Sequence, residues 1–312
     1  APAKLIGERQ RGLITYVMAL MNGARVGIAA QSLGIAEAAY RLARTYAHTR
    51  KQFGVPIERL PAVAEMVTDM KIAVEAARAL AYETSRVCDL ENNNNRVLEF
   101  NKNISPEEAK RRKADSRNLK RLNGMLTPMS KYYCSEMCVR VASDCIQVLG
   151  GSGYMKDYPA ERYLRDARIT TIYEGTSQLQ IVAAVRGVCS GGFEKEVEEL
   201  ENIEYTDPML VELRGKLDEA KALVLKGIAF VKAKGGEYMD LWGRKLVDAA
   251  AAVIIGHLFL RQANANDRKK AVARRFINMN MPTVKRDIDL VCSDDRTALD
   301  DYDLIAGPVP KE

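Results

Sequence analysis

The sequence contains few of the residues that commonly build metal sites and few aromatic side chains. Its 312 residues include only two histidines, His48 and His257, and none of its six cysteines forms a C-x-x-C pair. We therefore expect no metal site. Cys134, Cys138 and Cys145 recur at helical spacing, which predicts small core residues and fits a reducing compartment. Aromatic residues make up only 6% of the chain and no recognition motif occurs, which argues against a nucleic-acid partner.

Strand signals, a secretory signal and long apolar runs are also missing. The apolar run over 249–260 is too short to span a bilayer, so no membrane span is expected. Hydrophobic residues at 47% and charged residues at 28% are typical of a soluble globular protein. The net charge of +6 would suit anionic phosphate groups or have no functional meaning. Because the sequence does not begin with Met, we expect it to start inside a longer protein.

Helical periodicity dominates the sequence instead. Apolar residues recur every three or four positions over 22–49, 61–90 and 128–150, which predicts three long helices. Pro61 and Pro128 stand at the start of two of them, where a missing N–H costs little. Antiparallel packing of these stripes predicts an all-α fold with a four-helix-bundle-like core.

The pattern also predicts two domains with a linker. We place a helical domain at 1–190, an acidic linker at 191–207 and a helical module at 208–312, with helices near 208–233, 237–263 and 266–280. A basic insertion lies at about 92–123, and its asparagine run over 92–95 predicts a loop. The segment Ser105-Pro-Glu-Glu within it predicts a capped helix start. The basic residues that follow indicate a solvated helix face or a mobile insertion.

The stretch over residues 165–180 carries the strongest functional signal. Its centre is Tyr173-Glu174-Gly175-Thr176, in which a carboxylate stands beside a glycine and just before a predicted helix. Gly175 allows a sharp turn and the close approach of a ligand, and Thr176 suits the N-cap position. Backbone N–H groups at the helix start would face a polar or anionic ligand. The alternative is that Glu174 is only a solvated residue before a helix.

Four further segments occur with this stretch in a characteristic order. They are Arg25-Val-Gly-Ile-Ala-Ala-Gln-Ser-Leu-Gly, Arg50-Lys-Gln-Phe-Gly, Gln147-Val-Leu-Gly-Gly-Ser-Gly and Tyr158-Pro-Ala-Glu-Arg-Tyr-Leu-Arg-Asp. Together they resemble the C-terminal helical half of flavin-dependent acyl-CoA dehydrogenases, over roughly residues 3–190. The 208–312 module resembles the extra C-terminal helices of longer bacterial members. The family's N-terminal helical domain and middle β-domain would then precede this chain.

The resemblance implies α,β-desaturation of an acyl-CoA thioester, with Glu174 as the catalytic base that removes the α-proton. Such a carboxylate needs a raised pKa when substrate excludes water. Some family branches place the base immediately before the arginine that matches Arg25, and that position here is Ala24. The expected substrate-binding residues are Asn22, Arg25, Tyr173 and Gly175. Taken alone, Arg25 would be a surface charge and Tyr173 a core aromatic residue.

The resemblance also implies FAD as cofactor. The expected contacts are Arg50, Gln52, Phe53, Gln147, Gly150, Gly151, Thr176 and Gln178. Arg50 and Gln52 match residues that touch the dinucleotide of a neighbouring subunit, and an arginine fork suits pyrophosphate. By itself, the glycine cluster at Gly150 would predict only a helix end. Ile181 departs from the family pattern, because many relatives have arginine there.

The expected partners follow from the same resemblance. They are an acyl-CoA substrate, electron-transfer flavoprotein as electron acceptor, and further copies of the chain in a homodimer or homotetramer. A cytoplasmic location in a bacterium is expected, with the mitochondrial matrix as the alternative. An acyl-CoA oxidase and a non-catalytic helical association module are the competing functions. We expect these 312 residues alone to fold but to be inactive.

Overall fold

The computed structural model describes residues 2–12, 17–101 and 103–310, and it divides into two compact units. The first is Ala1–Gly187 and the second is Val188–Glu312. Both are helical, and the only strands among the described residues form one short hairpin. The prediction of an all-α fold is confirmed.

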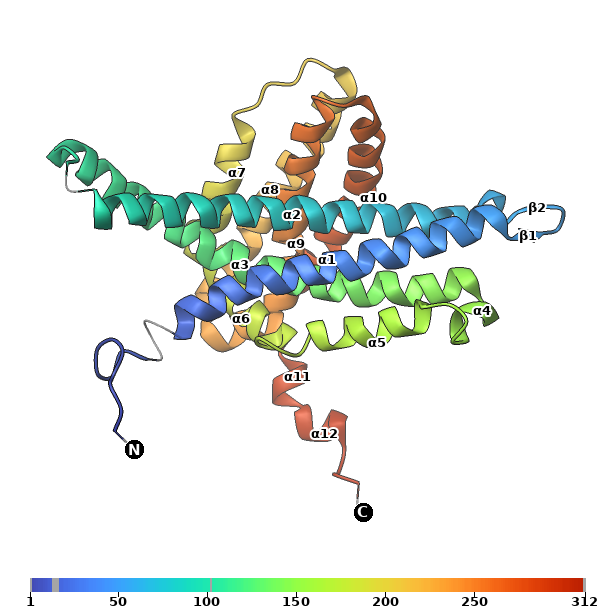
Figure 1. Ribbon diagram of the computed structural model, residues 1–312, viewed down its shortest axis with the longest axis horizontal. Coiled ribbons are helices and arrows are strands. Elements are labelled where there is room, and N and C mark those ends of the chain that lie inside the picture. Colours follow the sequence, from blue (N-terminus) through green and yellow to red (C-terminus); the bar gives the residue numbers. More distant parts are fainter. Residues whose placement is uncertain (1, 13–16, 102, 311–312) are drawn as a thin grey trace. The chain divides into compact units, whose positions relative to one another are not determined.

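Three long helices form the frame of the first unit (Figure 1). They are α1 (Met18–Thr49), α2 (Pro61–Phe100) and α3 (Pro106–Leu149), and consecutive helices run in opposite directions. Shorter elements follow them or connect them: β1 (Lys51–Gln52), β2 (Val55–Pro56), η2 (Ile57–Arg59), α4 (Gly151–Tyr154), α5 (Ala160–Thr170) and α6 (Ser177–Gly187). Helix α5 packs on α1 and α3, and α6 packs on α3. The predicted bundle-like core is therefore present.

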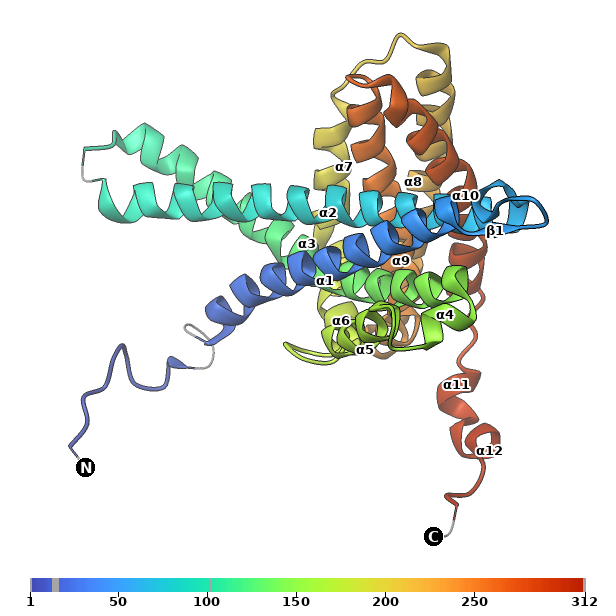
Figure 2. The ribbon, with the colours of Figure 1, turned by 45° about the vertical axis from the view of Figure 1, so that its right-hand side comes forward.

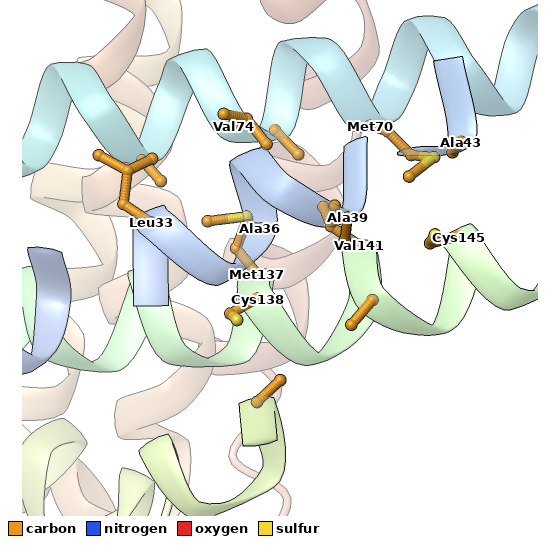
Figure 3. Packing of buried hydrophobic residues seen from close by; sticks show 14 of the residues in the cluster. Leu33, Ala36, Ala39, Ala43, Met70, Val74, Met137, Cys138, Val141 and Cys145 are labelled. Atoms are coloured by element: carbon orange, nitrogen blue, oxygen red, sulfur yellow. The ribbon is translucent and has the colours of Figure 1, made fainter. Parts of the chain in front are cut away.

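Small side chains bring α1 and α3 close together in this core (Figure 3). Ala36, Ala39 and Ala43 of α1 are fully buried and face Cys138 and Cys145 of α3. Short side chains at a helix contact allow a small interaxial distance. The prediction that the cysteines are core residues is confirmed, and burial raises the pKa of the Cys138 and Cys145 thiols to about 12.

The prediction of a loop at 92–95 is wrong, because α2 continues through this run to Phe100. Asn94 is buried, and its side-chain Nδ2 donates to the Arg112 carbonyl oxygen at 2.7 Å and to Ser116 Oγ at 2.8 Å. These partners on the facing helix outweigh the weak helix propensity of asparagine. The supposed insertion is an extension of the α2–α3 hairpin that projects past the start of α1 (Figure 2).

Helix α3 begins at the predicted Ser105 cap but joins two segments that the sequence predicts as separate helices. Ser105 Oγ accepts a hydrogen bond from the Glu108 backbone N–H at 3.1 Å, which confirms the predicted cap. The helix then continues through Pro128, so the expected helix start at 128 is wrong. Leu122 and Met125 before the proline and Met129 after it are all buried. Packing on both sides of Pro128 offsets its lost backbone hydrogen bond.

The second unit contains seven helical elements among its described residues. They are η3 (Val188–Gly192), α7 (Phe193–Glu201), α8 (Pro208–Lys234), α9 (Gly236–Ala263), α10 (Asp267–Val291), α11 (Thr297–Asp300) and α12 (Tyr302–Ala306). Helices α8, α9 and α10 pack on one another, and α7 packs on α9. The prediction of a linker at 191–207 is wrong for most of its length, since α7 buries Phe193, Val197 and Leu200 on the module.

Helix α9 is the central helix of the second unit. It is long and apolar enough to cross a membrane by length and composition, and 83% of its apolar window is buried. The helix matches the predicted 237–263, but its apolar window is longer than the run over 249–260, and core packing accounts for this composition. His257 on α9 is fully buried, as expected for a core residue. Burial lowers its pKa to about 4, and the charges of Arg214 and Lys221 act in the same direction.

Candidate functional site

The candidate base lies on a tight turn between α5 and α6. Glu174 has a φ of 56° and Gly175 a φ of 92°, so two consecutive residues occupy the left-handed region. A Cβ atom on Gly175 would lie 2.5 Å from Gln180 Nε2, so any larger residue would have to displace the Gln180 side chain. Thr176 Oγ1 accepts from the Leu179 N–H at 3.5 Å, in the capping role that the sequence predicts.

Two buried side chains hold the carbonyl groups of this turn. Gln180 Nε2 donates to the Glu174 carbonyl oxygen at 3.1 Å, and Lys131 Nζ donates to the Gly175 carbonyl oxygen at 2.8 Å. Both side chains are fully buried. Sequence reasoning missed both residues. The signal for Lys131 was a lone lysine inside the apolar stripe of α3.

Further hydrogen bonds fix the approach to the turn from both sides. The Tyr173 hydroxyl donates to Gln31 Oε1 of α1, and Ser177 Oγ donates to Glu136 of α3. The Ser177 backbone N–H donates to the Thr171 carbonyl oxygen at 2.9 Å. The turn is therefore anchored to α1 and α3, which pack against each other in the core.

Arg25 of α1 lies beside the same turn. Its Nη2 is 3.9 Å from the position of a Cβ on Gly175, and its Nη1 donates to Asn22 Oδ1 at 3.0 Å. Burial lowers the pKa of Arg25, and the negative charge of Glu174 opposes that shift. The structure thus brings the expected substrate-binding residues Asn22, Arg25, Tyr173 and Gly175 together around Glu174.

The expected cofactor residues form two groups. Thr176 and Gln178 lie at the start of α6, next to Glu174. The others lie at the opposite end of the bundle, on the β1–β2 hairpin and at the end of α3 (Figure 1): Arg50, Gln52, Phe53, Gln147, Gly150 and Gly151. The 25 residues from Arg25 to Arg50 correspond to about 37 Å of helix.

The distant group presents an open surface. Phe53 is 84% exposed, and a Cβ at Gly150 or Gly151 would have no atom within 4 Å. Beneath this surface, Tyr46 donates to Ser152 Oγ at 3.3 Å and packs edge-on against Tyr158, with ring centroids 5.7 Å apart. An exposed aromatic ring, an arginine and accessible glycine backbone fit the adenosine and pyrophosphate parts of a dinucleotide.

Comparison with known proteins connects these features to one family. Residues 11–188 match "Acyl-CoA dehydrogenase, C-terminal domain", and residues 189–294 match "Acyl-CoA dehydrogenase C terminal". An acyl-CoA dehydrogenase of Bacillus subtilis is 41% identical over 178 residues, which are 57% of this chain and 39% of that protein. The caffeyl-CoA reductase-Etf complex subunit CarC of Acetobacterium woodii is 36% identical over 175 residues, 56% of this chain and 38% of that protein.

Solved structures show the same fold over nearly the whole chain. ACDH-11 of Caenorhabditis elegans in complex with C11-CoA has a TM-score of 0.73 at 23% identity, covering 93% of this chain and 50% of that one. An acyl-CoA dehydrogenase of Bacillus anthracis complexed with FAD has a TM-score of 0.72 at 22% identity, covering 98% and 55%.

The match to the C-terminal domain covers more than half of the chain, and it agrees with the helical fold. The chain therefore belongs to the acyl-CoA dehydrogenase family. It spans well under half of the length of the curated relatives that it matches.

Proposed function

We propose that the chain is the C-terminal part of a FAD-dependent acyl-CoA dehydrogenase, in which Glu174 is the base for α,β-desaturation of an acyl-CoA thioester. The observation that carries this proposal is the left-handed turn at Glu174 and Gly175. Hydrogen bonds from Lys131 and Gln180 hold its carbonyl groups, and Arg25 lies beside it. A base held in fixed geometry beside the bound substrate can remove a proton that is only weakly acidic.

Each residue of the turn has a separate task in the proposed reaction. Glu174 removes the α-proton, and Gly175 leaves the space that the thioester needs. Arg25 and Asn22 hold the CoA portion, and Tyr173 is kept at the edge of the acyl site by its bond to Gln31. Bound FAD would supply the acceptor for the β-hydrogen as hydride. Thr176 and Gln178 would contact it beside the base.

The separation of the two groups of cofactor residues supports a shared site between subunits. Arg50 caps the far end of α1 and Phe53 lies on the hairpin beyond it, which is too far from Arg25 and the Glu174 turn for one bound cofactor to reach both. We therefore propose a homodimer or homotetramer in which the β1–β2 hairpin completes the FAD site of a neighbouring subunit. Electron-transfer flavoprotein is the proposed acceptor, and the CarC relative belongs to a complex named for Etf.

Replacement of the base tests the proposal. In the flavin-loaded full-length enzyme that contains this chain, the Glu174→Gln variant should retain FAD. Its rate of flavin reduction by substrate should fall by several powers of ten. The matched control is Glu161→Gln on α5, which removes only a surface ion pair with Arg165. Normal flavin reduction in the Glu174 variant would overturn the assignment. Rapid reoxidation by air without an acceptor protein would favour an oxidase.

The 312-residue chain alone provides a second test. Purified with added FAD and a panel of acyl-CoA thioesters, it should fold but show no substrate-dependent flavin reduction, because the family covers the flavin ring with a domain outside this sequence. A yellow protein whose flavin is bleached by an acyl-CoA would show that these residues are sufficient.

A further inference from the structure

Building on the proposed function, we infer that Lys131 is a positioning residue for the reaction. Its ammonium group fixes the peptide plane of the turn that carries Glu174 and places a positive charge behind that base. The contact joins the middle of α3 to the α5–α6 turn, and its short distance of 2.8 Å is that of a well-formed hydrogen bond.

The burial of Lys131 requires an explanation. Its side chain is fully buried, and no other lysine in the described ranges 2–12, 17–101 and 103–310 is buried. Its acceptor at Gly175 is a neutral backbone carbonyl rather than a carboxylate. Burying an ammonium group in an apolar helix face costs free energy, and an apolar side chain of similar length would pack there without that cost. Stability alone therefore does not account for a lysine at this position.

The geometry of the turn shows what the contact achieves. A trans peptide group points its C=O and its N–H in opposite directions. The Lys131 bond to the Gly175 carbonyl therefore turns the Thr176 N–H away from α3, and the Gln180 bond to the Glu174 carbonyl turns the Gly175 N–H away from Gln180 on α6. Because Gln180 Nε2 also lies 3.4 Å from the Gly175 carbonyl, it is shared between two acceptors. Lys131 supplies the closer contact to that carbonyl.

The charges around Lys131 couple it to the base. Arg25 faces it from α1, Glu136 from α3 and Glu174 from the turn. Burial, together with the positive charge of Arg25, lowers the pKa of Lys131 to about 8, although the two carboxylates oppose the shift. Lys131 is therefore still mainly positively charged at neutral pH, and that charge lies beside the turn that carries Glu174.

The test compares two substitutions in the flavin-loaded full-length enzyme. Lys131→Met keeps a long side chain but removes the donor and the charge, whereas Lys131→Arg keeps both. We expect Lys131→Met to slow the limiting rate of flavin reduction by an acyl-CoA about 10- to 100-fold. Flavin content, melting temperature and the dissociation constant of the acyl-CoA should change little. Lys131→Arg should recover part of the rate.

Ser135→Ala is the matched control, since Ser135 is equally buried on the same helix and its hydroxyl bonds only to the Tyr132 carbonyl oxygen, at 3.1 Å. It should reduce flavin at the wild-type rate. A wild-type rate in folded, flavin-loaded Lys131→Met would overturn the inference. A fall in rate that merely parallels a loss of flavin or of melting temperature would also overturn it.

The pH profile supplies a readout that a purely structural role would not change. Deprotonation of Lys131 should alter the wild-type rate near pH 8, and Lys131→Arg should lack this change because its guanidinium stays charged. If Lys131→Met does not fold, identical profiles in wild type and Lys131→Arg contradict the inference. The Glu174→Gln variant is measured alongside. A normal rate of flavin reduction in Glu174→Gln would refute the proposed function. A loss of reduction in Glu174→Gln combined with a normal rate in Lys131→Met would refute only the role of Lys131.

Discussion

Gly187, the last residue of α6, lies directly against the backbone of Met125 on α3. A Cβ atom on Gly187 would come within 2.7 Å of both the Cα and the Cβ of Met125. Neither atom belongs to the mobile end of a side chain, so the two helices would have to separate. Helix α6 is thus fixed at both ends, by this contact and by the Lys131 bond at the turn before its first residue.

Gly187→Ala should therefore destabilise the first unit by about 1–3 kcal/mol. The matched control is Gly124→Ala, one residue before Met125, where a Cβ meets nothing within 4 Å. In this exposed helical position alanine should be neutral or stabilise by up to about 1 kcal/mol. Urea unfolding of both variants checks the difference, and equal midpoints would contradict the close approach.

Gly175→Ala should damage the site as well as the backbone. The φ of 92° costs about 1–2 kcal/mol in any residue with a Cβ, and the new methyl group would displace Gln180 from the turn. Flavin reduction in the full-length enzyme should fall at least about tenfold. Gly235→Ala is the control, because its φ is 94° but its Cβ would meet nothing. It should lose similar stability and keep the full reduction rate.

The proposed sharing of the FAD site between subunits predicts complementation between two inactive variants. Glu174→Gln and Arg50→Ala should each be inactive or severely impaired alone. Subunits carrying the two changes, unfolded together and refolded, should recover roughly a quarter of the wild-type rate, because half of randomly assembled dimers are mixed and each has one intact site. Mixtures that stay inactive would show that both residues serve the site of their own chain.

His257 should make the stability of the second unit depend on pH. Its pKa is lowered from 6.5 to about 4 by burial, so the unfolded chain binds the proton more tightly than the folded one. Stability is therefore retained above pH 6.5 and lost as the pH falls toward 4, by about 3 kcal/mol for this group. His257→Leu should flatten this part of the profile in thermal unfolding. Phe259→Leu, in the same core, should lower stability at every pH and leave the slope unchanged.

The sequence predicts the local features of this fold well. The long apolar stripes, the Ser105 cap and the spacing of Cys134, Cys138 and Cys145 depend only on near neighbours, and all three appear in the structure. The same holds for the turn at Glu174, because glycine and threonine encode it locally.

Features that depend on distant partners escape such reasoning. Asn94 is helical because Arg112 and Ser116 on the facing helix accept hydrogen bonds from its side chain, and Arg112 donates one to it. Lys131 meets Gly175 across 44 positions of sequence. The prolines at Pro128 and Pro282 lie inside helices because packing on both sides holds those helices together. No periodicity in the sequence reports such contacts.

The length of helix α1 limits where insertions into this sequence can be tolerated. Asn22 and Arg25 lie near one end of this uninterrupted helix, and Arg50 lies at the other. If the two ends of α1 serve different catalytic centres, the length of this helix fixes the distance between those centres in the assembly. Adding one helical turn would move one centre by about 5.4 Å relative to the other, and no rotation about the helix axis would compensate for that shift. Insertions should therefore be accepted between α2 and α3 and rejected within α1.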